Sequence, residues 1–527
     1  MDMKATMNNS FSLHMGRVGV GLMLLCATLS GCEKKDEVEQ KDWDGTTTYY
    51  ASGDEKPATT YYAPYTGYVG DPMPFFDANT RSFKVLYLQE YRPNQATFHP
   101  YWGLETRDAA NYEPLSQVLP TGTAAEQDAH LGTGCVVYSE AEHLYYIYYT
   151  GEREMPKAGE DVQVIMRATS PDFKTWTKDP LFRLRGVADG YSAQDFRDPC
   201  IFFADDLWHM VIATRVGGKG NLVEYTSPNL KDWTHVGIFM PMMWDRFYEC
   251  PDVFQMGDWW YLVYSELSGG KGKEWGRHVQ YFKGHTLADL KACTAGDAGI
   301  WPDDHEGFLD SRGFYAGKTA TNGTDRFIWG WCPTREGNDN TKTNPEGEPQ
   351  WAGTLVAHRL IQHADGSLTL GEVPGIKAKY SNAKEVKAML TTDSCTLYSR
   401  LGYHNHLSLT VESADKFGIS FARGTDSKKW YTLVVNPEDG GAKRKINFEE
   451  EGPEGQGFIK AIDSYKFNKP ADNIYHIDIY TDNSVVTMYI NDCLAYTNRI
   501  YGVARNCWSV NNYGKEIKVS DIQLKQY

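Results

Sequence analysis

The sequence predicts an all-β protein, made of a five-bladed β-propeller followed by a C-terminal β-sandwich. The chain holds 34 Tyr and 15 Trp, and such flat rings favour half-buried strands over helices. A short strand-opening word recurs through residues 60–375 at intervals of roughly 50 to 65 residues, which is typical of a repeated unit. With 527 residues the chain is also longer than one compact core usually holds, so a second domain is expected after the repeats.

The first 32 residues are expected to be a lipoprotein signal peptide. Lys4 and Arg17 precede an apolar stretch, residues 18–29, that is too short to span a bilayer as a stable anchor. The stretch ends in Leu29-Ser30-Gly31-Cys32, which resembles the lipobox of bacterial lipoproteins. That resemblance implies cleavage before Cys32 and acylation of its thiol; the alternative is an ordinary signal peptide with an incidental cysteine.

Residues 33–59 are charged and poor in core-forming side chains, so we expect a tether. Within it, Lys34-Lys35-Asp36-Glu37 resembles the acidic export signal of surface lipoproteins in Bacteroides-like bacteria. These features predict a lipid-anchored protein of the cell envelope, in the outer membrane and exposed at the surface. Its contact with the membrane would be the N-terminal lipid alone.

Each repeat begins with an opening word and continues into an aromatic strand. The opening words are Gly70-Asp71-Pro72, Gly132-Thr133-Gly134, Arg197-Asp198-Pro199, Glu249-Cys250-Pro251 and Arg312-Gly313-Phe314-Tyr315. The aromatic strands are expected at residues 83–89, 144–149, 208–214, 260–265 and 326–331. A turn word, Ser170-Pro171-Asp172-Phe173, recurs as Ser227-Pro228-Asn229-Leu230, with a looser copy at residues 106–113. Units of this length hold four short strands and lack a helical period, which predicts five blades over residues 60–375.

The opening words place three carboxylates at equivalent positions. Asp71, Asp198 and Glu249 each lie at the start of a unit, and the first strand of a propeller blade lines the central channel. We therefore expect the three acids to converge, although each one beside a proline could by itself be a turn residue. Repulsion within such a cluster raises the pKa of at least one acid, as a general acid requires.

The successive words resemble the signatures of glycoside hydrolase family 32. The resemblance rests on Phe196-Arg197-Asp198-Pro199, Glu249-Cys250-Pro251-Asp252, Gly313-Phe314-Tyr315-Ala316 and Trp351-Ala352-Gly353, supported by Trp102-Gly103 and residues 327–331. It spans nearly all of the chain after the tether. The family includes invertases, inulinases and levanases, so the resemblance implies hydrolysis of β-fructosides. Fructosyltransferase and arabinanase families share the five-bladed fold and the three acids, so another furanoside such as arabinan stays open.

The resemblance also implies a role for each acid. Asp71 would be the nucleophile that forms a fructosyl-enzyme ester, Glu249 the general acid and then base, and Asp198 the stabiliser of an oxocarbenium-like transition state. Such a retaining mechanism places nucleophile and acid/base about 5–5.5 Å apart. The substrate-binding residues that it implies are Gln89, Trp102, Arg197, Tyr315 and Trp331. For Trp102, packing within a blade is the alternative.

The first opening word departs from the family pattern. The family reads Asn-Asp-Pro-Asn-Gly where this chain has Gly70-Asp71-Pro72-Met73-Pro74, and its Phe-Ser-Gly block is replaced by Gly132-Thr133-Gly134. Both amide side chains beside Asp71 are missing, and Pro74 fixes the backbone. Two functions stay open: a retaining hydrolase of levan- or inulin-type fructans, and a non-catalytic glycan-binding surface lipoprotein. We expect the enzyme because all three acids are present.

Residues 376–527 are expected to form the β-sandwich. Short β runs separated by turns begin at residues 391, 406, 417, 430, 474 and 485, a pattern typical of a sandwich. We expect this domain to support the propeller; a carbohydrate-binding role is the alternative.

Charge and cysteine usage exclude other classes of protein. The net charge of −16 disfavours nucleic acid and anionic membranes as partners. Eight of the ten cysteines follow Cys32 and lack zinc-ligand spacing, and Cys135, Cys200 and Cys250 are expected as small buried residues. The sequence holds no phosphate-binding loop, nucleotide fingerprint or HExxH motif. We therefore expect no metal and no cofactor, an oligo- or polysaccharide as partner, and a monomer.

Overall fold

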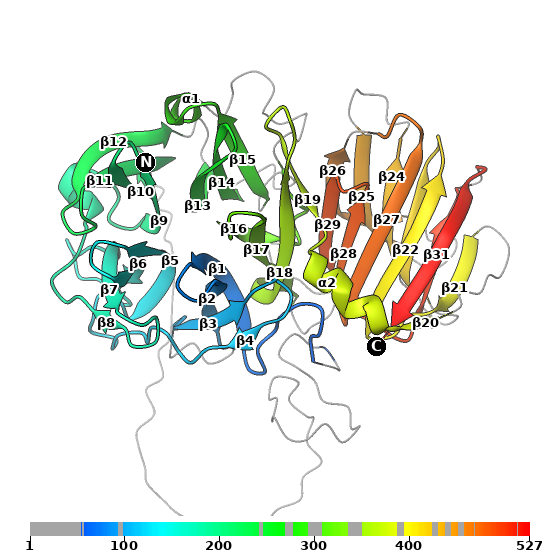
Figure 1. The fold of residues 1–527 in the computed structure, drawn as a ribbon, viewed down its shortest axis with the longest axis horizontal. Coiled ribbons are helices and arrows are strands. Elements are labelled where there is room, and N and C mark those ends of the chain that lie inside the picture. Colours follow the sequence, from blue (N-terminus) through cyan, green and yellow to red (C-terminus); the bar gives the residue numbers. More distant parts are fainter. Residues whose placement is uncertain are drawn as a thin grey trace, which may run out of the picture. The chain divides into compact units, whose positions relative to one another are not determined.

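The computed structural model describes residue 54 and residues 57–92, 98–241, 246–268, 278–293, 308–335, 350–386, 395–423, 430–437, 444–451, 458–467, 469–513 and 515–526. All of these belong to the second of two compact units, residues 35–527. Their elements are nearly all strands (Figure 1), so the predicted all-β class is confirmed. Within these ranges no helix is long and apolar enough to cross a membrane. The predicted signal peptide, Cys32 and most of the tether lie outside the described residues.

The largest sheet joins the beginning and the end of the N-terminal region. Its order is β16-β17-β18-β1-β2-β3-β4, and β19 pairs with β18. The link between its halves is the antiparallel pairing of β1 with β18, where Val69 lies opposite Gly353. The strands are β1 (Tyr68–Asp77), β2 (Ser82–Glu90), β3 (Tyr101–Thr106), β4 (Glu113–Pro114), β16 (Tyr315–Thr321), β17 (Arg326–Thr334), β18 (Gln350–Gln362) and β19 (Leu368–Gly371).

Three antiparallel sheets lie between these two halves in the sequence, in the orders β5-β6-β7-β8, β12-β11-β10-β9 and β13-β14-β15. Their strands are β5 (His130–Ser139), β6 (Leu144–Glu152), β7 (Gln163–Ser170), β8 (Thr177–Lys178), β9 (Phe196–Ala204), β10 (Leu207–Val216), β11 (Lys219–Ser227), β12 (Thr234–Pro241), β13 (Arg246–Met256), β14 (Trp259–Ser268) and β15 (Val279–Gly284). A 3-10 turn, Gly186–Asp189, precedes β9, and helix α1 (Leu287–Ala292) follows β15.

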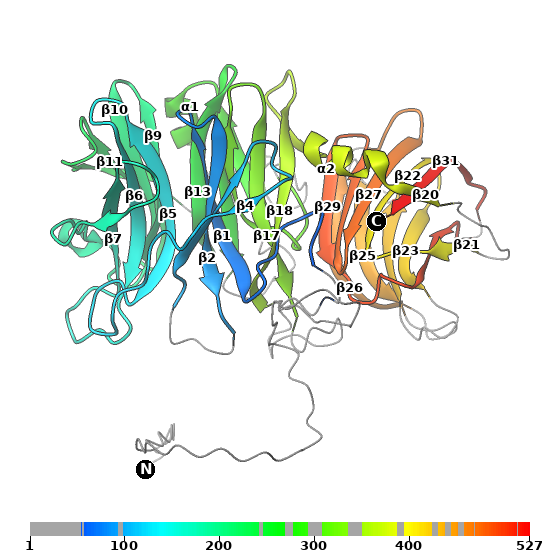
Figure 2. The same ribbon diagram turned by 60° about the horizontal axis from the view of Figure 1, so that its bottom comes forward.

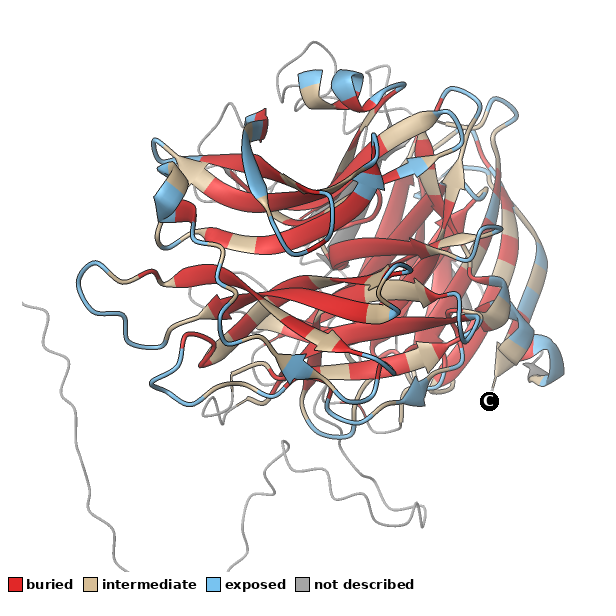
Figure 3. Ribbon diagram, turned by 60° about the vertical axis from the view of Figure 1, so that its left-hand side comes forward, coloured by how far each residue is buried: buried red, intermediate tan, exposed pale blue. Residues whose placement is uncertain are grey.

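The strands that carry the opening words lie next to one another. Strand β1 contacts β5, β5 contacts β9, β9 contacts β13, β13 contacts β16, and β16 returns to β1. Neighbouring sheets pack through shared cores, as where Tyr146 and Tyr148 of β6 meet Met210 and Ile212 of β10. Figure 3 shows the burial concentrated along the strands, whereas many connecting turns are exposed. The site residues at the opening words are therefore held by packed strands.

The recurring turn word is a structural repeat. Asp172 Oδ1 accepts hydrogen bonds from the backbone N–H groups of the second and third residues that follow it. Asn229 Oδ1 and Asp108 Oδ1 do the same in their own turns. In each turn the residue after the acceptor has a positive φ: 62° at Phe173, 61° at Leu230 and 55° at Ala109. The acceptor side chain closes an Asx turn, which explains why only Asp or Asn stands there.

The C-terminal strands form two six-stranded sheets around one core. Their orders are β20-β31-β22-β27-β28-β29 and β21-β30-β23-β24-β25-β26 (Figure 2). Alternate residues of β22 and β23, including Leu407, Leu409, Ile419 and Phe421, are buried in this core. The strands are β20 (Lys384–Val386), β21 (Cys395–Arg400), β22 (His404–Glu412), β23 (Phe417–Arg423), β24 (Trp430–Asn436), β25 (Arg444–Glu451), β26 (Phe458–Phe467), β27 (Ile474–Asp482), β28 (Val485–Ile490), β29 (Leu494–Arg499), β30 (Cys507–Asn511) and β31 (Lys518–Gln526).

One buried arginine connects the C-terminal sheets to the N-terminal strands. Arg499, at the end of β29, is fully buried. Its guanidinium donates to the carbonyl oxygens of Pro333 and Cys332 and to the hydroxyls of Thr354 and Ser484, at 2.7 to 3.1 Å. Helix α2 (Pro374–Lys379) and the 3-10 turn Tyr380–Asn382 lie between the two groups of sheets in the sequence. The two groups therefore share a polar junction in which the buried guanidinium donates four hydrogen bonds.

The five aromatic strands expected from the sequence all lie inside observed strands β2, β6, β10, β14 and β17. Cys200 and Cys250 are buried as expected, whereas Cys135 is half-buried, and all three thiols are free. The number of propeller blades, the sandwich and the domain boundaries stay predictions.

Candidate active site

The three acids stand where their strands break register with the neighbouring strand. The pairing of β1 with β2 shifts between Gly70 and Met73, and that of β13 with β14 shifts between Glu249 and Asp252. The pairing of β9 with β10 shifts opposite residues 198–199. Each break contains a proline, which has no N–H to give to the ladder. Bulges of this kind re-aim side chains next to active sites.

The backbone at these breaks is strained. Asp71 has φ 30°, Asp198 φ 58°, and Cys250, directly after Glu249, φ 50°. Positive φ is uncommon for residues other than glycine. Strain of this kind concentrates at functional sites, where the surrounding packing maintains it.

The carboxylate of Asp71 has two side-chain hydrogen bonds. Thr133 Oγ1 donates to Oδ2 at 2.7 Å, and Trp331 Nε1 donates to Oδ1 at 2.9 Å. Burial raises the pKa of Asp71; these two hydrogen bonds oppose the shift, and the nearby charge of Glu249 adds to it. The pair of donors thus favours the charged form that a nucleophile needs.

Asp198 is the most buried of the three acids. Its side chain is 5% exposed, and Oδ2 accepts a hydrogen bond from the backbone N–H of Cys250 at 2.9 Å. Burial raises the pKa of Asp198 to about 7, with Arg197 opposing the shift and Glu249 adding to it. Near neutral pH, Asp198 therefore exchanges between its charged and protonated forms.

Both oxygens of Glu249 are hydrogen-bonded. Arg197 Nη2 lies 3.0 Å from Oε1, and the hydroxyl of Tyr315 donates to Oε2 at 2.6 Å. Arg197 also lies 4.0 Å from Asp198 and forms an ion pair with Asp195 at 2.8 Å. One guanidinium thus bridges two of the three acids and holds them at a fixed spacing.

Of the five residues expected to bind substrate, three contact the acids. Arg197, Tyr315 and Trp331 do so as described, and the rings of Tyr315 and Trp331 lie 5.4 Å apart. Gln89 is buried on β2 and its amide donates to the carbonyl of Thr66 instead. Trp102 lies on β3 opposite Tyr87 and packs against the main core. For these last two residues, a role in binding sugar stays a prediction.

Two residues of the site had no assigned role in the sequence analysis. Thr133, the donor to Asp71, stands at the opening word of β5, so the register of the repeats could have revealed it. Trp351 lies beside the site, with its ring centroid 5.9 Å from that of Trp331 and 4.6 Å from that of His99. The word Trp351-Ala352-Gly353 marks this residue in the sequence, but its contacts with Trp331 and His99 depend on packing between distant strands.

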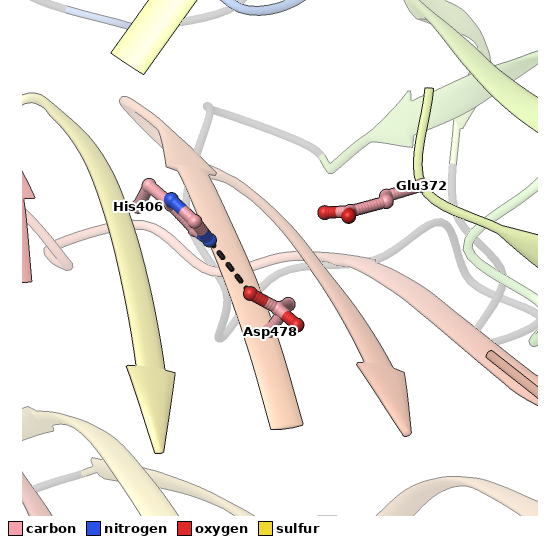
Figure 4. A group of neighbouring side chains, drawn as sticks. All are labelled: Glu372, His406 and Asp478. Atoms are coloured by element: carbon pink, nitrogen blue, oxygen red, sulfur yellow. Dashed lines mark hydrogen bonds and ion pairs between the residues drawn. The ribbon is translucent and has the colours of Figure 1, made fainter. Parts of the chain in front are cut away.

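Another group of ionisable residues lies near helix α2. Ligand atoms of Glu372, His406 and Asp478 lie within 4.8 Å of one another (Figure 4). Lys377 Nζ already contacts Glu372 Oε1 at 2.5 Å, and Tyr480 donates to Oε2 at 2.7 Å. His406 Nε2 lies 2.8 Å from Asp478 Oδ1. Because an ammonium already occupies the position of a cation, we interpret this group as an ion-pair network.

The acids, the arginine and the aromatic donors together suit the hydrolysis of a glycosidic bond. Asp71, which accepts two side-chain hydrogen bonds, can serve as nucleophile. Glu249, held by Arg197 and Tyr315, can serve as proton carrier, and Asp198, whose pKa is raised to about 7, as charge stabiliser. The family model described as "Glycosyl hydrolases family 32 N-terminal domain" matches residues 61–372, more than half of the chain. A second, "GH32, BT1760-like, C-terminal domain", matches residues 366–524. The chain belongs to glycoside hydrolase family 32.

Curated relatives agree with this membership. A sucrose-6-phosphate hydrolase of Zymomonas mobilis is 26% identical over 462 residues, covering 82% of this chain and 83% of the relative. A raffinose invertase of Escherichia coli is 25% identical over 467 residues, covering 84% and 88%.

Solved structures share the fold at low identity. Fructan 1-exohydrolase IIa from Cichorium intybus superposes with a TM-score of 0.69 at 16% identity, covering 89% of this chain and 97% of that one. An exo-inulinase from Aspergillus awamori gives 0.69 at 18% identity, covering 90% and 99%.

Proposed function

We propose that this chain, a family 32 β-fructosidase, hydrolyses levan- or inulin-type fructans with retention of configuration, through a fructosyl ester on Asp71. The observation that carries the proposal is a chain of polar contacts that links Asp71, Asp198 and Glu249 from three different sheets. Thr133 donates to Asp71, Thr150 joins the carbonyl of Thr133 to the backbone N–H of Asp198, and Arg197 pairs with both Asp198 and Glu249. Retaining hydrolysis needs a charged nucleophile beside a proton donor. The two hydrogen bonds to Asp71 favour its charged form, and Glu249, linked to Asp198 through Arg197, is the carboxyl group that we assign to proton transfer.

In the first step, an oxygen of Asp71 attacks the anomeric carbon of the fructosyl unit. The bond from that carbon to the leaving oxygen breaks, and Glu249 gives its proton to that oxygen. Positive charge develops on the sugar ring as the bond breaks, and the negative charge of Asp198 stabilises it. Arg197 keeps Asp198 and Glu249 in place during the transfer.

In the second step, the fructosyl ester is hydrolysed. Glu249, now a carboxylate, takes a proton from a water molecule, whose oxygen attacks the same anomeric carbon. The ester bond to Asp71 breaks and the carboxylate returns to its hydrogen bonds with Thr133 and Trp331. Two inversions at one carbon give net retention.

We further propose five blades over residues 60–375 and a sandwich over residues 376–527. The closed order of contacts among β1, β5, β9, β13 and β16 supports five blades, each built outward from one of these strands. The core between two six-stranded sheets supports the sandwich.

A lipid anchor on Cys32 would place this enzyme at the outer membrane, exposed to polysaccharide outside the cell. This part of the proposal rests on the lipobox-like residues 29–32 and the charged tether. We expect a monomer in detergent or after removal of the first 32 residues.

The test is to incubate the purified protein with levan, inulin, sucrose and arabinan and to measure released reducing sugar. Release of fructose or fructo-oligosaccharides from levan or inulin supports the proposal, and an initial β-fructose anomer seen by NMR supports retention. Arabinan cleavage alone would replace the substrate class. If the protein binds fructan but no preparation of it cleaves any of these substrates, the result would instead support a non-catalytic glycan-binding protein.

A further inference from the structure

The ring of Trp351 fills the position that a side chain at residue 70 would occupy. A Cβ placed on Gly70 would lie 2.2 Å from Cη2 of Trp351 and 2.7 and 2.8 Å from two further ring atoms. Contacts under 3.0 Å are not tolerated between such atoms, so the indole occupies the position of any side chain at residue 70. Glycine at this position is therefore required by the ring of Trp351.

The indole of Trp351 is fixed on several sides. Its ring lies 4.6 Å from His99 and 5.9 Å from Trp331, centroid to centroid. His99 Nε2 is itself held by Glu90 Oε2 at 2.5 Å. The guanidinium of Arg92 donates to the backbone carbonyls of Trp351 and Ala352, which holds the start of β18. A ring held in this way has few rotamers left and can serve as a rigid surface.

The same ring lies beside the proposed nucleophile. Gly70 directly precedes Asp71, and Trp331, whose ring lies 5.9 Å from that of Trp351, donates to Asp71 Oδ1 at 2.9 Å. Trp351 is only half-buried. Trp351 therefore keeps solvent-accessible surface in the immediate neighbourhood of the reacting carboxylate.

We propose that Trp351 is the residue that determines how the sugar is held beside Asp71, as an apolar wall against which the C–H face of the fructosyl ring packs. The inference rests on the proposed function, because it assigns a substrate contact to the same site. Sugar pockets combine an aromatic surface with a few directed polar groups. Here Trp351 supplies the surface, while Arg197 and Asp198 supply polar contacts. With glycine at residue 70, no hydrogen bond from a side chain at that position holds the sugar.

The first experiment compares Trp351→Ala and Trp351→Phe with the native chain on levan- and inulin-derived oligosaccharides. We expect Trp351→Ala to raise KM by about tenfold or more while kcat falls less than threefold, since the lost contact acts mainly in binding. Trp351→Phe keeps a smaller ring, so its KM should lie between that of the native chain and that of Trp351→Ala. Isothermal titration of each variant in a Glu249→Gln background measures the same loss without turnover.

The chain contains a matched control. Trp259 also packs on a glycine, because a Cβ on Gly366 would lie 2.3 Å from its ring, yet it stands at the β13–β14 turn and contacts His285 and Lys283. Trp259→Ala removes the same ring from an equivalent packing. It should leave KM and oligosaccharide binding unchanged, whatever it does to the melting temperature.

A double-mutant cycle tests whether residues 70 and 351 act as one unit. Gly70→Ala should displace the indole and raise KM about as much as Trp351→Ala does. In the Trp351→Ala background, Gly70→Ala should add less than a twofold further effect, because the clash is gone. If the two substitutions change KM additively, Gly70→Ala does not act by displacing the ring of Trp351.

The outcomes separate this inference from the proposed function. If the native chain cleaves fructans and Trp351→Ala, folded by its melting curve, keeps native KM and binding, the inference is wrong and the function stands. If no fructoside is cleaved but oligosaccharide binding weakens tenfold in Trp351→Ala, the inference stands and the enzymatic proposal is wrong. Absence of both binding and cleavage overturns both.

Discussion

The hydroxyl of Thr133 donates a hydrogen bond to Oδ2 of Asp71 at 2.7 Å, from a strand of a different sheet. Because this bond favours the carboxylate, it opposes the rise in the pKa of Asp71 that burial causes. An uncharged residue thus tunes the protonation of the proposed nucleophile.

Replacing Thr133 by valine should move the acidic limb of the pH profile. Loss of the donor raises the pKa of Asp71 further, so the reactive carboxylate is lost at a higher pH as the solution is acidified. A hydrogen bond to a charged group contributes about 1.5 kcal/mol or more, which corresponds to a shift of about one pH unit. The measurement is kcat/KM between pH 3 and pH 8. Thr133→Ser, which keeps the hydroxyl, and Thr432→Val, a buried threonine of β24, should leave the limb in place.

Replacing Asp198 by asparagine should stabilise the protein at alkaline pH while reducing its activity. Burial raises the pKa of Asp198 to about 7. The contribution of this carboxyl group to the free energy of unfolding is therefore fully present below the pKa that Asp198 has in the unfolded chain, and is lost as pH rises through 7. Asparagine removes the cost of the buried charge, which is about 2 to 4 kcal/mol at most. Urea unfolding at pH 4 and pH 8 should show the variant's advantage only at pH 8. An equal gain in the free energy of unfolding at pH 4 and at pH 8 would contradict the raised pKa of Asp198. The control is Asp205→Asn, because Asp205 is exposed.

Replacing either reacting carboxylate should separate activity from stability. Asp71→Asn and Glu249→Gln should each lower kcat by about 10²–10⁴-fold, the usual contribution of such groups, with melting temperatures close to native. Asp252→Asn is the control, because this acid lies next to the site but accepts hydrogen bonds from Thr319. Near-native turnover by Asp71→Asn would refute its role as nucleophile.

Replacing Arg499 by methionine should destabilise the whole unit. The change removes the hydrogen bonds that Arg499 donates to the carbonyls of Pro333 and Cys332, and breaking a buried charged network costs about 3–5 kcal/mol. Thermal unfolding should show a clear decrease in melting temperature. Exposed Arg505→Met should cost less than about 1 kcal/mol, and equal losses in both variants would show that burial of Arg499 is not the cause.

The sequence predicted the strands well because each repeat carries its own local signals. The aromatic runs lie inside β2, β6, β10, β14 and β17 since alternating rings suit a pleated, half-buried surface. The common register of Asp71, Asp198 and Glu249 likewise predicted that they would share one site, because equivalent positions of repeated strands lie at equivalent heights. Their chemical roles stay predictions.

The rest of the site could not be predicted from local sequence because it depends on packing across sheets. Gly70 suggested a missing hydrogen bond, whereas the structure shows the space filled by Trp351 from β18. Gln89 is predicted to bind sugar, and the structure adds a hydrogen bond from its amide to the carbonyl of Thr66 that local sequence does not indicate. At both positions the surroundings are set by a residue from another segment of the chain.

Each reacting group stands on a bulge of its own strand, and no two of the three share a sheet. The bulge that carries Asp71 is thus separate from the other two, whereas the bulges of β9 and β13 are coupled by the hydrogen bond from the Cys250 N–H to Asp198. Directed evolution of this enzyme can therefore vary the strand that carries Asp71 by itself, for example to favour an alcohol over water as the acceptor, whereas the strands that carry Asp198 and Glu249 have to be varied together.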